Sequence, residues 1–239
     1  MERGAGRVLA AIRSLPVFRG LTVDDQRRVA ALATLKTYRR GDVLWREGDP
    51  ADALTVIVRG SVKVVRHAGV GDVIFELFGE GEPVGAIAVY NCMPYYASAI
   101  CLEPVTLLAL PRRDYFELLD RHPEFARGII RELTKLTLAL TRRLEEMRGQ
   151  RVEVRIAQLF LTLAERMGRE KPEGVEIPLQ LSRQEVADLI GTTVESAIRV
   201  LSRWGREGVL VTGKGRFVVP SRDRLRRFAE GESSEDGKG

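Results

Sequence analysis

Hydrophobic and polar positions follow two different periods along the 239-residue chain. In its first half, short apolar runs are separated by glycines and polar residues. These runs begin near Val43 and include Leu54–Val58, Val62–Val65, Val73–Phe78 and Val105–Leu110. Many short strands, roughly 8–12 residues apart, are typical of a sandwich or barrel. This block is therefore predicted to form a β-domain, with helical spacing before it at residues 7–14 and 23–35.

From Arg112 onward the spacing of apolar residues changes to the period of a helix. Pro123 suits a first helical turn, and the pattern continues to about Arg148. The apolar positions of this long helix are Ala126, Ile129, Leu133, Leu136, Leu140 and Met147, and its opposite face carries Arg131, Lys135, Arg142 and Glu145. Such a seam predicts packing against a second copy of the chain, with Ile129, Leu133, Leu136, Leu140 and Met147 at the contact. A core helix of a single domain is the alternative.

After a candidate hinge at Gly149-Gln150 come a helix at about 152–167 and a loop at 168–174. Ser182 and Glu185 then have the spacing of a capping box, which begins a short helix. Gly191 ends that helix because glycine adopts the left-handed turn without strain. A second helix follows, capped by Thr192 or Thr193, and its core residues are predicted to be Ala197, Ile198, Leu201 and Trp204. Two short helices across a glycine turn are typical of the helix-turn-helix, whose second helix enters the DNA major groove.

The second helix of this unit carries candidate base-reading side chains. They are Val194, Glu195 and Arg199, and the last two share one face because they are four residues apart. An arginine can bond bidentately to guanine, and a glutamate can accept from the cytosine amino group. An ordinary intrahelical salt bridge is the alternative. A hairpin follows at 209–219, and the candidate contacts to the DNA backbone are Ser182, Arg183, Thr192, Thr193, Lys214 and Arg216.

The distribution of charge agrees with a DNA-binding carboxy-terminal part. The whole chain carries a net charge of +5. Between Ser182 and Phe228 alone, ten Lys and Arg face five Asp and Glu, whereas the tail after Phe228 is acidic. A basic module is expected to contact phosphates, although a solvated face can have the same charge.

Composition excludes several other classes of protein. No uninterrupted apolar run exceeds five residues, so neither a membrane span nor a signal peptide is predicted. Two cysteines and two histidines do not supply a four-cysteine zinc or iron–sulfur site. The sequence contains neither a phosphate-binding Gly-Lys-Ser/Thr loop nor a Ser–His–Asp constellation, so nothing in it indicates an enzyme. The chain is expected to be a soluble cytoplasmic protein without a metal, and not an enzyme.

From Phe18 to about Pro220 the chain resembles the Crp/Fnr superfamily of bacterial transcription regulators. The segments that carry the resemblance are Arg40-Gly41-Asp42, Glu47-Gly48-Asp49-Pro50, Val58-Arg59-Gly60-Ser61-Val62-Lys63 and the helix-turn-helix. The resemblance implies an α+β fold: an amino-terminal double-stranded β-helix (jelly-roll) sensor domain, a long dimerisation helix and a carboxy-terminal winged helix-turn-helix. The boundaries expected are 1–122 for the sensor, 123–149 for the helix and hinge, 150–228 for the DNA-binding domain and 229–239 for an acidic disordered tail.

The same resemblance implies a homodimer that binds double-stranded DNA and recruits or excludes RNA polymerase. Family members bind palindromes whose half-sites share a central GA step. The glutamate and arginine that read this step match Glu195 and Arg199. Val194 replaces the arginine of the cyclic-AMP receptor branch and is closer to the fumarate–nitrate regulator branch.

The effector segment departs from the cyclic-AMP receptor branch. Gly85 is retained, but Ala86 replaces the glutamate that holds the ribose, and Tyr95 and Tyr96 replace the Arg-Ser pair that holds the phosphate. The candidate effector pocket consists of Gly85, Ala86, Tyr95, Tyr96, Ala97 and Thr141. We expect no cyclic AMP there. These residues are compatible with an aromatic or uncharged small-molecule effector. They are equally compatible with a sensor domain (β-roll) whose interior is filled by its own side chains and binds no ligand.

Redox sensing is a further alternative within the same family. Haem ligation through His67 or Cys92 would use this fold as some relatives do, although no cofactor is expected. Thiol sensing would involve Cys92 and Cys101, but the apolar neighbours of Cys101 indicate an ordinary buried residue.

Overall fold

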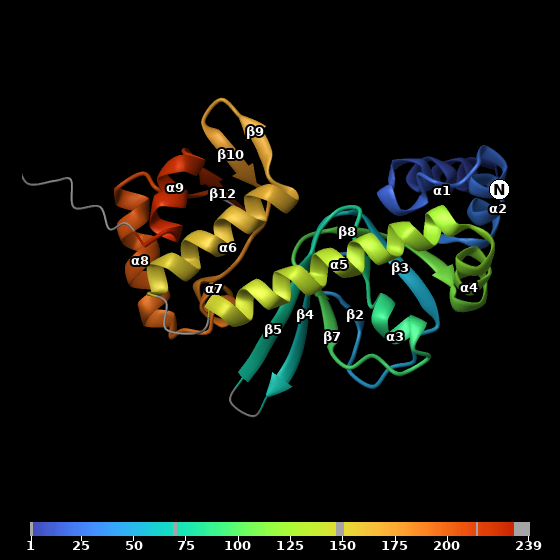
Figure 1. The fold of residues 1–239 in the computed structure, drawn as a ribbon, viewed down its shortest axis with the longest axis horizontal. Helices are drawn as coiled ribbons and strands as arrows, with labels where there is room; N and C mark the ends of the chain where they lie inside the picture. The colour runs from blue at the N-terminus through green and yellow to red at the C-terminus, as the bar shows by residue number, and fades with distance from the viewer. Residues whose placement is uncertain (1, 69–70, 147–150, 214, 232–239) are drawn as a thin grey trace, which may run out of the picture. The chain divides into compact units, whose positions relative to one another are not determined.

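The computed structural model describes residues 2–68, 71–146, 151–213 and 215–231 (Figure 1). The chain separates into two compact units, Met1–Gly71 with Phe75–Ala139 and Asp72–Ile74 with Leu140–Gly239. Met147, Lys214, the candidate hinge Gly149-Gln150 and residues 232–239 of the acidic tail lie outside the described residues. The domain boundaries expected from the sequence remain a prediction.

The first unit combines two antiparallel four-stranded sheets with helices. One sheet has the order β1-β8-β3-β6 and the other β2-β7-β4-β5. The strands are β1 (Thr34–Tyr38), β2 (Val43–Trp45), β3 (Ala53–Arg59), β4 (Val62–Ala68), β5 (Gly71–Phe78), β6 (Pro83–Val84), β7 (Ser98–Cys101) and β8 (Val105–Pro111). The helices are α1 (Glu2–Ser14), the short 3₁₀ helix η1 (Pro16–Phe18), α2 (Val23–Leu32), α3 (Ala86–Tyr90) and α4 (Arg112–Arg121), and α5 (Pro123–Glu146) belongs to this unit as far as Ala139. This arrangement confirms the expected β-sensor architecture.

Strand β1 was missing from the sequence prediction, as were the short strands β6 and β7. The helical spacing expected at residues 23–35 stops at Leu32, and β1 begins at Thr34. Strand β1 pairs along its whole length with β8, where Leu35 lies opposite Leu108. A partner more than 60 residues away along the chain fixes this strand, so local periodicity could not reveal it.

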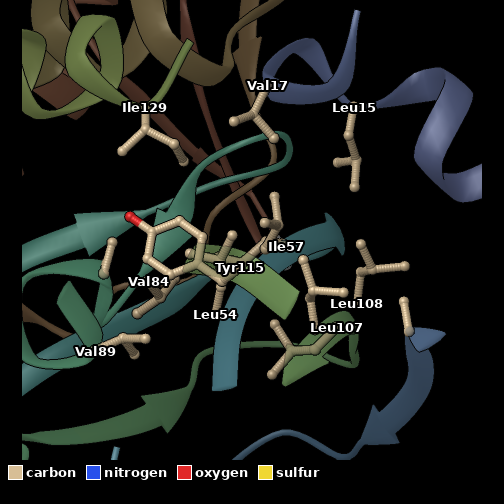
Figure 2. Close-up of a cluster of buried hydrophobic side chains, with 14 of the residues drawn as sticks. Leu15, Val17, Leu54, Ile57, Val84, Val89, Leu107, Leu108, Tyr115 and Ile129 are labelled. Carbon is tan, nitrogen blue, oxygen red and sulfur yellow. The ribbon is translucent and has the colours of Figure 1, made fainter. Parts of the chain in front are cut away.

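The central strand β3 is buried on both faces. Leu54, Thr55, Val56 and Ile57 are all buried in succession, although successive side chains of a strand point to opposite faces. Helices α3 and α4 contact β3, and one continuous apolar cluster joins the helices to both sheets. Figure 2 shows part of that cluster, which includes Leu54, Ile57 and Tyr115 together with Ile129 from α5. Burial on both faces explains why this strand has no polar alternation.

The second unit is a helical domain with a small sheet. Its elements are α6 (Val152–Met167), β9 (Arg169–Lys171), β10 (Gly174–Ile177), α7 (Arg183–Ile190), α8 (Val194–Arg206), β11 (Val211–Gly213), β12 (Arg216–Val219) and α9 (Arg222–Ala229). The sheet order is β11-β12-β10-β9. The aromatic pairs Phe160–Phe217 and Trp204–Phe228 join the helices and the sheet in its core, with ring centroids 4.8 Å and 4.9 Å apart.

The segment predicted as a loop at 168–174 is instead mostly a hairpin. Glu170 of β9 pairs with Val175 of β10, and β10 pairs in turn with β12. The predicted wing is thus the outer half of a four-stranded sheet. No helix in the described part of the chain is long and apolar enough to span a membrane.

Candidate functional site

The first helix of the helix-turn-helix begins and ends as its sequence predicts. Ser182 Oγ accepts a hydrogen bond from Glu185 N at 3.1 Å, and Glu185 Oε2 accepts one from Ser182 N at 2.8 Å. This reciprocal pair is the capping box. Gly191 ends the helix with φ +63°, in the left-handed region that favours glycine.

Thr193, rather than Thr192, caps the second helix. Its Oγ1 accepts a hydrogen bond from Ser196 N at 3.3 Å. The buried residues of α8 are Ala197, Val200, Leu201 and Trp204. This stripe has the spacing i, i+3, i+4, i+7 that a core-facing helix requires. The prediction that Ile198 faces the core was wrong, because Val200 takes that place and Ile198 is 44% exposed.

The predicted base-reading residues lie on the solvent side of α8. Glu195 and Arg199 are exposed, and Val194 is half-buried at the helix start. Neither Glu195 nor Arg199 forms an ion pair within the part of the chain that the structure describes. The guanidinium and the carboxylate therefore both face solvent.

Helix α6 contacts both the turn and the second helix of the helix-turn-helix. Arg155 Nη1 donates hydrogen bonds to Ile190 O at 2.6 Å and to Gly191 O at 3.1 Å, at the turn between α7 and α8. Glu153 forms an ion pair with Arg203 of α8 at 2.8 Å. One side chain of α6 thus binds the turn and another binds the second helix. Neither contact was foreseen, because each joins residues more than 30 positions apart.

Both arginines among the predicted phosphate contacts have partners within the protein. Arg216 Nη1 donates to Glu176 Oε2 at 2.7 Å, and the Glu176 side chain is only 13% exposed. Arg183 Nη2 donates to Thr212 Oγ1 at 3.2 Å. Partial burial lowers the pKa of Arg183, although an arginine stays charged at neutral pH. The carboxylate of Glu176 therefore partly compensates the positive charge of Arg216 in the protein alone.

Four of the predicted effector residues lie together, but they pack on one another. Tyr95 stacks on Trp45 with ring centroids 4.1 Å apart, and Trp45 Nε1 donates to Ala97 O at 3.1 Å. A Cβ atom at Gly85 would lie 2.6 Å from the Tyr95 ring. Ala86 is buried beside them as the first residue of α3. The side chain of Tyr95 thus fills the space next to Gly85.

The other two candidate effector residues are both exposed. Tyr96 is 43% exposed on the surface after α3. Thr141 is exposed on the part of α5 that belongs to the second unit. The structure therefore groups four of the six predicted residues.

A cavity of about 330 Å³ lies in the first unit, and only Tyr95 of the predicted effector residues lines it. Strands β1, β2, β3 and β8 and the loop between β2 and β3 supply its walls. Its charged groups are Lys36, Asp49 and Asp52, and Tyr38 and Trp45 are further aromatic walls. Burial, together with the carboxylates of Asp52 and Asp49, raises the pKa of Tyr95 to about 12. Its hydroxyl therefore stays protonated at neutral pH. Of the two carboxylates, that of Asp52 is paired with Arg112 at 3.4 Å.

The predicted dimer seam on α5 is divided between the core and the surface. Ile129 is 3% exposed inside the core of the first unit, and Leu133 packs against the same core. Leu136 is half-buried, whereas Leu140 is exposed. A second stripe is exposed and has steps of four, three and four residues: Ile130, Thr134, Thr137 and Thr141. The hydroxyls of Thr134 and Thr137 donate to Ile130 O and Leu133 O, so their methyl groups remain as the outer surface.

The two cysteines differ in environment. Cys92 is exposed and Cys101 is buried, and burial raises the pKa of the Cys101 thiol to about 11. The side chain of His67 lies outside the described residues. Among the residues that are described, no three His, Cys, Asp or Glu side chains form a group that could hold a metal ion.

Comparison with known proteins identifies both units. Residues 35–122 match the cyclic nucleotide-binding domain, and residues 154–228 match the Crp-like helix-turn-helix domain. The cyclic AMP receptor protein of Thermus thermophilus is 28% identical over 221 residues, which cover 92% of this chain and 99% of that protein. The transcriptional regulatory protein btr of Bordetella pertussis is 30% identical, with 72% of this chain and 71% of that protein covered. The structure of FixK2 from Bradyrhizobium japonicum has a TM-score of 0.71 at 20% identity, covering 82% of this chain and 96% of that one, and supports the fold.

Proposed function

The chain belongs to the Crp/Fnr family of transcriptional regulators, and from that premise we propose that it binds a palindromic promoter site as a homodimer gated by a signal other than cyclic AMP. The observation that carries the proposal is the exposed face of α8, where Glu195 and Arg199 have no partner within the described chain. At a promoter, such a dimer would recruit or exclude RNA polymerase.

Base readout is assigned to Arg199, Glu195 and Val194. A bidentate arginine–guanine contact contributes about 1–3 kcal/mol of discrimination, so Arg199→Ala is expected to relax the preference at one base pair of each half-site. Selection from randomised duplexes should return a palindrome for the parent, with half-site centres about 10–10.5 base pairs apart. Arg227→Ala is the matched control, since Arg227 is an exposed arginine of α9. An identical consensus for Arg199→Ala and the parent would contradict the assignment.

The dimer contact is placed on the exposed stripe of α5 rather than on Ile129. Its heptad-like steps and methyl surface support close packing against a second helix. Ile130→Glu would bury a carboxylate in that contact without a partner and is expected to give monomers in sedimentation. Ile130 is 61% exposed, so the unit itself should still fold. Leu32→Glu, at an exposed leucine of α2, is the control that should leave the dimer intact.

We propose that the signal acts through the β-roll, the β-domain of the first unit. The relative from Thermus is named for cyclic AMP, but here Tyr95 occupies the space beside Gly85, and Ala86 offers no carboxylate to a ribose. Calorimetry with cyclic AMP is expected to show no binding at micromolar concentration. Mass spectrometry and visible absorption of natively purified protein distinguish a retained small molecule, haem or no effector at all. Micromolar binding of cyclic AMP would contradict this part of the proposal.

A further inference from the structure

Two exposed arginines on α8 carry charges that no carboxylate in the described chain neutralises. Arg199 and Arg206 are exposed, and neither forms an ion pair or a side-chain hydrogen bond with a described residue. Arg203, by contrast, pairs with Glu153 at 2.8 Å. Arg199 and Arg206 are seven residues apart, which is about two helical turns, so they lie on one face roughly 10 Å apart along the helix. This face is therefore open to an acidic partner.

The residues that follow α9 are strongly acidic. Glu230 is exposed at the end of α9, and Gly231 follows in the left-handed region with φ +85°. The described chain ends there. Residues 230–236, here named the acidic segment, contain no basic side chain and four carboxylates: Glu230, Glu232, Glu235 and Asp236. Four negative charges thus follow directly after the last helix.

Helix α9 ends next to α8. Phe228, in its last turn, packs against Trp204 of α8 with ring centroids 4.9 Å apart. Arg224 Nη1 also donates a hydrogen bond to Glu207 O at 2.8 Å, where α8 ends. Trp204 lies between the two exposed arginines in the sequence of α8. The acidic segment therefore begins beside the part of the helix that carries both arginines.

The acidic segment is long enough to reach them. An extended chain spans up to about 3.3–3.6 Å per residue, so Asp236 can lie up to roughly 16–18 Å from Gly231. A helix with its side chains is only about 10–12 Å across. Arg206 is two residues after Trp204 and Arg199 is five residues before it, which is about 3 Å and 8 Å along the helix axis. Carboxylates of the segment therefore have the reach to pass from the buried side of α8 to its exposed face.

We propose that the acidic segment binds the exposed face of α8, at Arg199 and Arg206, and competes with DNA for this face. Guanidinium groups bind carboxylates with the same geometry as phosphates. Exposed ion pairs are individually weak. Tethering offsets this weakness, because it gives the segment a high effective concentration at α8. This inference rests on the proposed function, because it requires α8 to be the DNA-binding face.

The strength of the competition depends on how often the segment covers α8. If it does so in roughly 70–90% of the molecules, the apparent Kd for DNA rises about three- to tenfold, because only the uncovered fraction is competent to bind. The segment must leave before any duplex binds, so the factor is the same for specific and for random DNA. Added salt screens exposed charge pairs, so the effect should fade as the salt concentration rises.

The test removes charge from the acidic segment and keeps its length. Glu235→Gln/Asp236→Asn is compared with the parent by fluorescence anisotropy, on the palindrome that the parent selects and on a random duplex. At about 50 mM salt the variant is expected to bind both duplexes about threefold or more tightly, and at about 300 mM the difference should disappear. In an Arg206→Gln background the gain should be smaller, because one of the two partners is missing.

A matched control accounts for the change in net charge. Glu165→Gln/Glu173→Gln also removes two exposed carboxylates from the second unit. It is expected to change DNA affinity by less than about twofold, because these charges lie outside the proposed contact. Equal gains for the two double variants would overturn the inference, since net charge alone would explain them. A gain on only one of the duplexes, or an undiminished gain in the Arg206→Gln background, would overturn it as well. If the parent selects no palindrome, it is the proposed function that fails, and the affinities for the random duplex still decide the inference.

Discussion

The hydrogen bonds from Arg155 to the turn of the helix-turn-helix make a quantitative prediction. Arg155→Met keeps the length and the apolar stem of the side chain but removes the guanidinium. The lost contacts are those to Ile190 O at 2.6 Å and Gly191 O at 3.1 Å, at the carboxy-terminal end of α7. A cation is favourable there, because the free carbonyls give a helix end a partial negative charge.

The magnitude follows from these contacts. A hydrogen bond that involves a charged group contributes about 1.5–3 kcal/mol, and the helix end adds up to about 1 kcal/mol for a surface cation. Arg155 Nε is buried without a hydrogen-bond partner, so removing the guanidinium also relieves a desolvation cost. We therefore expect Arg155→Met to lower the free energy of unfolding of the second unit by about 2 kcal/mol. For a domain of this size that corresponds to roughly 8 °C or more in melting temperature.

The assay uses the tryptophans of the two units. Trp204 is fully buried in the second unit, whereas Trp45 belongs to the first. In a Trp45→Phe background, urea unfolding followed by fluorescence therefore reports on the second unit of the intact chain. Arg155→Lys keeps the charge and should lose less than Arg155→Met. Arg227→Met, at an exposed arginine, should stay within about 0.5 kcal/mol of the parent.

An unchanged unfolding midpoint for Arg155→Met would refute this reasoning. The turn would then be fixed by Gly191 and the core residues alone, and α6 would have no part in holding it. If Arg155→Met lowers the free energy of unfolding only as much as Arg227→Met does, the reasoning is refuted as well. The effect would then come from the change in net charge and not from the hydrogen bonds of Arg155.

Three further predictions concern charge, thiol chemistry and packing. Glu176→Gln should tighten non-specific DNA binding at low salt, because it removes a carboxylate 2.7 Å from Arg216; an unchanged affinity in a filter-binding assay would show that the pair persists on DNA. A thiol reagent at pH 8 should label Cys92 within minutes and leave Cys101 unmodified until the chain unfolds, because burial raises the pKa of the Cys101 thiol to about 11; mass spectrometry of tryptic peptides distinguishes the two, and equal labelling would contradict the buried position. Gly85→Ala should destabilise the first unit by about 1–3 kcal/mol, because it combines φ +74° with a Cβ atom 2.6 Å from an aromatic carbon; a melting temperature equal to that of the parent would show that this ring can move aside.

Features that depend on neighbouring residues could be predicted from the amino-acid pattern alone. The capping box of Ser182 and Glu185, the left-handed Gly191 and the hairpin of β11 and β12 each involve residues within a few positions of one another. Their hydrogen bonds form within one helical turn or one tight turn, so residue types at fixed spacing are sufficient to predict them. The exposed pair Glu195 and Arg199 followed from the same local geometry.

Which apolar residues are buried depends on contacts between distant parts of the chain. Ile129 and Ile198 both belong to helical stripes that periodicity alone assigns to one face, yet the first is buried against its own sheets and the second is exposed. The apolar stripe of a helix is wider than the surface that one packed element covers. Whether a residue at the edge of the stripe is buried therefore depends on which element packs against that edge. In the same way, the Arg216–Glu176 pair and the Trp45–Tyr95 stack join residues 40 to 50 positions apart. Such residues meet only when the sheets and helices pack around a common core. A local sequence pattern cannot predict these contacts because it contains no information on that packing.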